Sequence, residues 1–157
     1  MENIKIKKAT IKDLDDIVGL AGLMLDFHES FDKYYTIYSK YEDHKEFYKN
    51  QLQKKNAQFL IAKDKNGEAV GFGQSSIISM PKTKAPKIGK LISIFVKPEY
   101  RDKKIGKVIF EQQMEWLKKN KVKYIEMHVD ARNKKSLALW KKYGFKDYQI
   151  NLKMDLK

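Results

Sequence analysis

The chain has 157 residues and a mass of 18.5 kDa, a size at which a single domain spanning residues 1–157 is expected. Apolar residues make up 42% of it, enough for one hydrophobic core, which excludes a wholly disordered chain. There is no cysteine, so disulfides, thiolate metal sites and a cysteine acyl-enzyme are excluded. The sequence has no apolar run of membrane-spanning length and no signal-peptide core at its N-terminus, so we expect a soluble cytoplasmic protein.

The net charge is +13, and among the 33 basic residues only Arg101 and Arg132 are arginine. Nucleic-acid interfaces favour arginine, because its planar guanidinium binds phosphate or guanine at two points. A lysine-rich surface is more typical of composition bias and solubility, so a basic nucleic-acid-binding module is kept only as an alternative. Between Lys82 and Lys107 there are nine basic residues and two acidic ones, a balance that would attract a small polyanion.

The first part of the sequence predicts one strand and two helices. Residues 4–9 alternate as in a strand, and Thr10 forms a capping box with Asp13. Apolar residues then recur at helical spacing, which predicts a helix over residues 11–29. A tyrosine-rich segment follows, and a second helix is expected over residues 42–55.

A β-hairpin is predicted next. The sequence DKNG at residues 64–67 is a strong turn signal between strands over 58–63 and 70–79. Gly71 and Gly73 lie inside the second strand, where glycine indicates a bulge or a close backbone neighbour.

The rest of the chain alternates strands with helices. Residues 90–96 are mostly apolar, as in a strand buried on both faces, and Pro98 ends this strand. The later elements are a helix over 105–120, a strand over 123–129, a helix over 133–143 and a final strand over 148–156. This order predicts an α/β or α+β fold with a mixed sheet flanked by helices.

The segment KLISIFVKPEYRDKKIGKVIF, residues 90–110, carries the clearest chemical signal. A strand leads through a tight basic turn into a helix with Gly106 in its first turn. A helix start presents N–H groups without intrahelical partners and the positive end of the helix dipole, a combination that binds phosphate. Gly106 allows close approach of a ligand, although a glycine needed only for packing is the alternative. The countercharge would come from Arg101, Lys103, Lys104 and Lys107.

This segment resembles motif A of the GNAT superfamily of N-acetyltransferases, whose (Q/R)-x-x-G-x-(G/A) turn lies over the pyrophosphate of coenzyme A. Lys104 stands where the first glycine of that pattern normally lies, and it is tolerable if its backbone keeps a negative φ. The resemblance implies that the backbone of Phe95 and Val96 meets the pantetheine, and that an N–H near residues 94–96, beginning at Ile94, receives the thioester carbonyl. The residues matching the turn are Arg101, Asp102, Lys103, Lys104, Ile105 and Gly106.

A second stretch, NKKSLALWKKYGF at residues 133–145, resembles another motif of the same family. Helix capping alone explains Asn133 and Gly144, but the resemblance implies that the Asn133 side chain contacts the pantetheine arm. The family usually has a tyrosine acid four residues before this glycine, where the present chain has Trp140. The resemblance also implies the fold: a mixed, mostly antiparallel sheet splayed between two parallel strands and flanked by about four helices.

The implied reaction moves an acetyl group from acetyl-CoA to a primary amine by direct attack in a ternary complex. Trp140 cannot reprotonate a thiolate, so Tyr143 is the candidate acid and solvent the alternative. For the base, Glu126 and His128 lie on one face of the strand over residues 123–129. A structural polar pair is the alternative interpretation of these two residues.

The amine acceptor, a small molecule or a peptide, is not identified by the sequence. In this family its pocket is formed by the first helix pair and the strand before motif A, which makes Glu29, Tyr34 and Tyr35 candidates. A solvated loop is the alternative. Polyamine-acetylating relatives carry acidic residues at positions matching Ile92 and Ser93, whose identity here argues against a polyamine.

Two further expectations concern partners. The three histidines share no metal-ligand spacing, so no metal is expected, and neither is a membrane partner. Small enzymes of this kind are often dimers, which makes a homodimer compatible with the resemblance. The departures at Lys104 and Trp140 leave one more alternative, a family member that binds coenzyme A without catalysing transfer.

Overall fold

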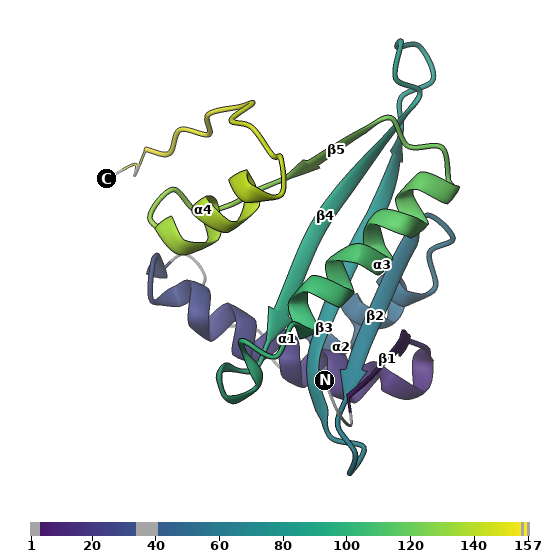
Figure 1. Cartoon of the computed structure of the whole chain (residues 1–157), viewed down its shortest axis with the longest axis vertical. Helices are drawn as coiled ribbons and strands as arrows, with labels where there is room; N and C mark the ends of the chain where they lie inside the picture. Colours follow the sequence, from purple (N-terminus) through teal and green to yellow (C-terminus); the bar gives the residue numbers. More distant parts are fainter. Residues whose placement is uncertain (1–3, 34–40, 155, 157) are drawn as a thin grey trace.

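The computed structural model describes residues 4–33, 41–154 and 156, which form a five-stranded sheet with helices on both faces (Figure 1). Strands β1 to β4 pair antiparallel in sequence order, and β5 pairs parallel to β4, so the predicted mixed fold is confirmed. No helix within the described ranges is long and apolar enough to cross a membrane. The strands are β1 (Lys5–Lys8), β2 (Ala57–Lys63), β3 (Ala69–Ser79), β4 (Lys87–Val96) and β5 (Tyr124–Met127). The helices are α1 (Leu14–Glu29), α2 (Tyr41–Leu52), α3 (Ile105–Lys119) and α4 (Lys134–Lys142), with short 3-10 turns at Ile11–Asp13 and Pro98–Tyr100.

Alternation along β2 explains why helices cover both faces of the sheet. Phe59 and Ile61 are buried in a cluster with residues of α1, whereas Leu60 and Ala62 are buried in a second cluster with residues of α3. Because successive side chains of a strand point to opposite faces, β2 contributes side chains to two hydrophobic cores. The α1 side and the α3 side of the sheet are therefore distinct layers, and the site described below lies where they meet.

The predicted capping box lies at the start of the 3-10 turn that leads into α1. The Asp13 carboxylate accepts hydrogen bonds from the Thr10 backbone N–H at 3.0 Å and from the Lys7 ammonium at 2.8 Å, and Lys63 lies 3.2 Å away. Burial of Asp13 raises its pKa, but the hydrogen bonds from Lys7, Thr10 and Lys63 outweigh burial and lower the pKa to about 2. The first helix is thus tied to β1 and β2 through one buried carboxylate.

The predicted hairpin and its glycines are also confirmed. Asp64 accepts from two backbone N–H groups of the turn at 2.9 Å, and Gly67 has a φ of +84°. A Cβ on Gly73 would collide with Ile109 of α3, and a Cβ on Gly71 would lie 2.8 Å from a carbonyl oxygen of β4. Both glycines therefore mark close neighbours, as the sequence indicated.

One predicted element is wrong. Residues 146–154 lie outside every helix and strand, although a strand was expected over 148–156. The alternation of apolar and polar residues permits a strand, but a strand also requires a neighbour for its backbone groups, and none of the described strands pairs with this segment. The tyrosine-rich candidates Tyr34 and Tyr35 lie outside the described residues.

Candidate active site

Strands β4 and β5 diverge halfway along β4. Their parallel register runs from Ile88 opposite Tyr124 to Leu91 opposite Met127 and stops there. Strand β4 continues to Val96 while remaining paired with β3 on its other side. A register irregularity between β3 and β4 lies next to the point of divergence. The splay expected between two parallel strands is confirmed, and the last part of β4 lines one wall of it.

The turn over residues 101–106 leads from the end of β4 into α3 and is exposed up to Lys104. Two of its residues, Asp102 and Lys104, have φ angles of +62° and +63°, in the left-handed region. Lys104 therefore does not meet the condition of a negative φ, because the turn keeps the backbone conformation that glycine would give it. A side chain in this region costs roughly 1–2 kcal/mol, and such strain is concentrated where function holds it in place.

Helix α3 begins at this strained turn. Lys104 is its N-cap and makes no side-chain cap, so the first amides, from Ile105 on, are directed toward the exposed turn. A Cβ on Gly106 would lie 3.8 Å from Ile94 and Val96, an ordinary van der Waals distance, and Gly106 does not have a positive φ. Neither packing nor backbone strain requires glycine here.

Basic side chains surround the turn. Arg101 donates from Nε to the Val96 carbonyl at 3.2 Å, and its guanidinium lies 5.3 Å from the centre of the Phe27 ring on α1. Lys103 places its ammonium 4.7 Å from the Tyr100 ring. Arg101 therefore connects the turn, the end of β4 and the end of α1 at the mouth of the splay.

Helix α4 begins with the predicted cap. The Asn133 side chain accepts from the Ser136 backbone N–H at 3.0 Å through Oδ1, which leaves its Nδ2 group for other contacts. Trp140 donates its indole N–H to the Ser136 hydroxyl at 3.0 Å. The capping interpretation of Asn133 is thus confirmed, and the indole N–H that replaces the usual tyrosine hydroxyl is engaged within the helix.

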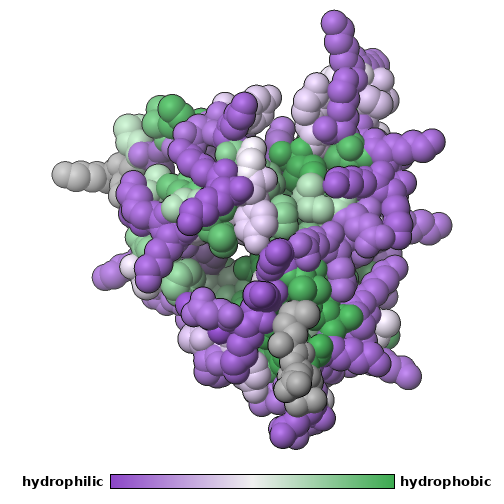
Figure 2. All heavy atoms as spheres, in the orientation of Figure 1, coloured by the Kyte–Doolittle hydropathy of each residue, from purple (hydrophilic) through white to green (hydrophobic). Residues whose placement is uncertain are grey.

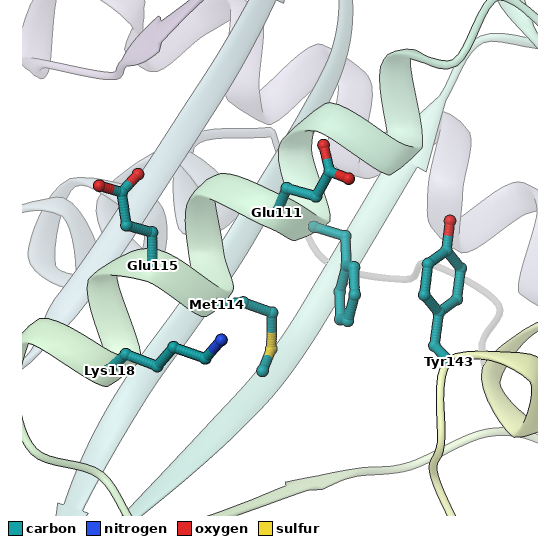
Figure 3. Close-up of a pocket in the computed structure, with 6 residues that line it drawn as sticks. Glu111, Met114, Glu115, Lys118 and Tyr143 are labelled. Atoms are coloured by element: carbon teal, nitrogen blue, oxygen red, sulfur yellow. The ribbon is translucent and has the colours of Figure 1, made fainter.

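A pocket of about 360 Å³ lies between α3 and the end of α4 (Figure 3). Tyr143 faces α3 across it, and its ring centre lies 4.7 Å from that of Phe110. Figure 2 shows the same face hollowed, with hydrophobic surface inside and hydrophilic side chains around it. Tyr143 is therefore accessible from the α3 side of the sheet. The lining residues are Phe110, Glu111, Met114, Glu115, Lys118 and Tyr143.

The other candidates lie on the α1 side. The register of β5 places Tyr124 and Glu126 on one face, and Glu126 forms an ion pair with Lys90 of β4. His128 follows the end of β5 and is exposed. Glu126 is thus one member of a structural ion pair, although its partner is Lys90 and not His128.

A charged network that the sequence did not reveal joins α1 to the loop after β5. Arg132 lies 3.1 Å from Asp32 and 2.7 Å from Asp130, and its hydrogen bonds to Asp130 lower the pKa of that carboxyl to about 2. His28 of α1 lies near Asp130: burial lowers its pKa, and the Asp130 charge offsets part of this effect. Glu29, a predicted acceptor contact, lies beside them, half-buried at the end of α1. Arg132 and Asp32 are 100 residues apart, so no local motif signals the network.

Comparisons with known proteins agree with this geometry. The sequence matches the Acetyltransferase (GNAT) family over residues 13–145. An uncharacterized N-acetyltransferase of Methanocaldococcus jannaschii is 26% identical over 92% of this chain, and the match spans 62% of that relative's length. A spermidine N(1)-acetyltransferase of Thermoplasma acidophilum is 25% identical, over 92% of this chain and 89% of the relative.

Solved structures share the fold. The aminoglycoside N-acetyltransferase AAC(6')-Iy, solved with the bisubstrate analogue CoA-S-monomethyl-acetylneamine, superposes with a TM-score of 0.78 at 17% identity, over 99% of both chains. This likeness concerns the fold, whereas the sequence match covers both motifs and the strand between them. The chain is therefore a member of the GNAT family of acetyltransferases.

Proposed function

We propose that this protein transfers an acetyl group from acetyl-CoA to a primary amine by direct attack within a ternary complex. The observation that carries the proposal is the start of α3, where a glycine that packing does not require lies in an exposed basic turn. This turn follows the end of β4, the half of the strand that β5 no longer pairs with. A diphosphate bound at the start of α3 would therefore leave the rest of its ligand within reach of the gap between β4 and β5.

The residues present fit coenzyme A. The first amides of α3, at Ile105 to Lys107, would hold the diphosphate, with Arg101, Lys103 and Lys104 supplying countercharge. The backbone of residues 94–96, which has no β5 neighbour among the described strands, would hold the pantetheine together with the Asn133 Nδ2 group. Trp140 would contact the same arm from α4. Acetyl-CoA supplies the activated acetyl thioester, and this chain supplies its orientation, which is worth roughly 7–11 kcal/mol in well-oriented reactions.

Proton transfer is assigned to two side chains on opposite sides of the sheet. His128 is the proposed base that takes the proton of the acceptor amine, since Glu126 is held by Lys90. Tyr143 is the proposed acid on the α3 side, since the Trp140 indole donates to Ser136 and cannot reprotonate a thiolate. Solvent is the alternative proton source.

The acceptor is proposed to enter from the α1 side, where the end of α1 faces the loop after β5. Glu29 and the network of Asp32, Asp130 and Arg132 border this entrance. One relative is named a spermidine acetyltransferase and one structural neighbour an aminoglycoside acetyltransferase, so both classes belong in an acceptor screen. Ser93 and the exposed Ile92 supply no carboxylate on β4, which favours acceptors other than polyamines.

Thiol release from acetyl-CoA with a panel of amines tests the proposal. The panel contains polyamines, aminoglycosides, amino acids and peptides with free N-termini or lysines. We expect turnover with at least one class, and we expect His128→Asn to lower kcat by about 100-fold. His44→Asn, a histidine on α2, is the matched control. Coenzyme A binding without turnover on any amine would instead support a binding protein.

A further inference from the structure

The two arginines of the chain both contact the end of α1, and they do so from opposite walls of the gap between β4 and β5. Arg101 lies in the turn after β4, whereas Arg132 lies in the loop between β5 and α4. They are the only arginines among 33 basic residues. A guanidinium is planar, so it can lie over an aromatic ring or bind a carboxylate at two points, a geometry that an ammonium lacks. The contacts of the two arginines use this geometry.

Arg101 is held against Phe27 in the last turn of α1. Its guanidinium carbon lies 5.3 Å from the centre of the Phe27 ring, and its Nε donates to the Val96 carbonyl at 3.2 Å. Among the residues that the structure describes, none accepts a hydrogen bond from the terminal nitrogens of Arg101. The ring and the single Nε bond therefore hold the guanidinium in place and leave its terminal N–H groups for an anion at the turn.

Arg132 is held to the same end of α1 by a carboxylate. One of its terminal nitrogens donates to Asp32 at 3.1 Å and to Asp130 at 2.7 Å, and its Nε donates to the second Asp130 oxygen at 2.9 Å. Asp32 also accepts from Lys153 at 2.9 Å. The residue after Arg132 is Asn133, the N-cap of α4 that is proposed to contact the pantetheine. The pair of Asp32 with Arg132 thus joins the second wall of the gap to α1.

The segment between these two contacts, residues 27–32, is a continuous turn that we call the α1 bridge. The rings of Phe27 and Phe31 pack edge to face, with their centres 5.3 Å apart. The backbone N–H groups of Phe31 and Asp32 both donate to the His28 carbonyl, at 2.9 and 3.1 Å. Figure 1 shows α1 running across the sheet toward the loop before α4. A displacement at one arginine contact is therefore transmitted to the other.

We propose that Phe27 and Asp32 are positioning residues, which hold the two walls of the gap at a fixed separation through the α1 bridge. This inference rests on the proposed function, because the ligand between the walls is coenzyme A. Arg101 would meet its diphosphate and Asn133 its pantetheine. A gap whose walls are already in position avoids the cost of ordering them on binding, which increases affinity. A bridge released at either end no longer holds the other wall, so the two residues act together.

Titration calorimetry with coenzyme A measures this cooperation. Phe27→Leu removes the ring and keeps an apolar side chain, whereas Asp32→Asn removes the charge and keeps the shape. Each variant is expected to bind coenzyme A about fivefold more weakly, the range of one cation–π contact or one exposed ion pair. The double variant is expected to lose less than about tenfold, whereas two independent contacts would lose about 25-fold.

Three further variants are controls. Phe27→Tyr keeps the ring and should bind coenzyme A as the wild type does. Phe47→Leu removes a ring of α2 that is 52% exposed, and Lys153→Met removes the other ion pair of Asp32. Both should also leave the affinity unchanged. Thermal unfolding shows which variants are folded.

The Nε–H resonances of the two arginines give a second, local measurement. Because the chain has only two arginines, replacing either one with lysine assigns both signals. Both Nε–H groups donate hydrogen bonds, so both should exchange slowly with solvent in the wild type. Asp32→Asn should speed exchange at Arg101, and Phe27→Leu should speed it at Arg132, although neither variant alters a direct contact of that arginine. One folded variant is enough for this measurement.

Two results would overturn the proposal while leaving the proposed function intact. One is wild-type affinity in the single variants, or a double variant that loses the product of their effects. The other is an arginine exchange rate that changes only when the direct partner of that arginine is replaced. A wild type that binds no coenzyme A at millimolar concentration would overturn the proposed function and this inference together.

Discussion

Charged side chains have different partners on the α3 side and on the α1 side of the sheet. On the α3 side, the exposed turn over residues 101–106 brings basic side chains to a helix start, and its contacts are with rings and a carbonyl oxygen. On the α1 side, ammonium and guanidinium groups are matched by carboxylates, as in Lys7 with Asp13 and Lys90 with Glu126. Charge on the α1 side holds the fold together, whereas charge at the turn is available to an anion.

Because of this difference, we expect different residues to determine the free energy of unfolding and the affinity for coenzyme A. Changes of charge or space at the turn are expected to alter coenzyme A affinity and, apart from relief of backbone strain at Lys104, to have little effect on the free energy of unfolding. Changes to matched charges such as that of Asp13 with Lys7 are expected to do the reverse. Three substitutions test the two halves of this statement.

The largest effect is expected at the helix start. Gly106→Glu places a bulky negative side chain at the proposed diphosphate site and should weaken coenzyme A binding about 100-fold, or roughly 2.7 kcal/mol. Its unfolding free energy should change little, because a Cβ there meets only ordinary contacts. Gly22→Glu on α1, where a Cβ has no neighbour within 4 Å among the described residues, is the matched control. Titration calorimetry and thermal unfolding measure both quantities, and equal affinity in the two variants would contradict the assignment.

The next largest effect is expected at Asp13, one of the paired carboxylates on the α1 side. The pKa of Asp13 is about 2 in the folded chain and 3.8 unfolded, so its ionisation stabilises the fold by about 2 kcal/mol above pH 3.8. This contribution is lost as the pH falls from 3.8 through 2. Asp13→Asn should lower the unfolding free energy by about 2 kcal/mol at pH 7 and flatten its dependence between pH 4 and pH 2, with coenzyme A affinity unchanged.

Asp15→Asn is the control for this measurement. Asp15 is on the same helix and pairs with Lys45, but its side chain is 70% exposed, so its removal should cost at most about 1 kcal/mol. Urea unfolding at several pH values gives the comparison. If the two variants lose equal stability at pH 7, burial of Asp13 does not have the role assigned to it.

The smallest effect concerns strain at the turn. Lys104→Gly removes a left-handed side chain and should raise the unfolding free energy by about 1 kcal/mol. Lys121→Gly, at a φ of +58° beyond the end of α3, should do the same. Only Lys104→Gly should weaken coenzyme A binding, by about threefold, because only it removes a cation from the turn. Equal affinity in both variants would mean that Lys104 contributes no countercharge.

Features set by a few neighbouring residues were predictable from the sequence. The Thr10–Asp13 cap, the DKNG turn and the Asn133 cap each depend on side chains within three or four positions, and all are present. The basic turn before α3 belongs to the same class, since a strand, a turn and a helix start place it locally. The proposed cofactor side of the site is built mainly from such local features.

Features that depend on distant partners were not predictable. The ion pair of Lys90 with Glu126 and the contact of Arg132 with Asp32 join segments 36 and 100 positions apart. The left-handed φ of Lys104 was not predictable either, because the turn dictates the conformation more strongly than the residue does. The final strand fails for a related reason: its pattern is local, but its pairing partner is not.

The claim that the start of α3 binds a diphosphate can be tested by observing the backbone amides of this helix start directly. In ¹H–¹⁵N spectra of the full chain titrated with coenzyme A, the resonances of Ile105, Gly106 and Lys107 should shift together and their solvent exchange should slow at saturation. Desulfo-coenzyme A should give the same response, since the thiol is remote from these amides. Saturable binding that leaves all three resonances unchanged, or no binding at millimolar coenzyme A, would contradict the claim.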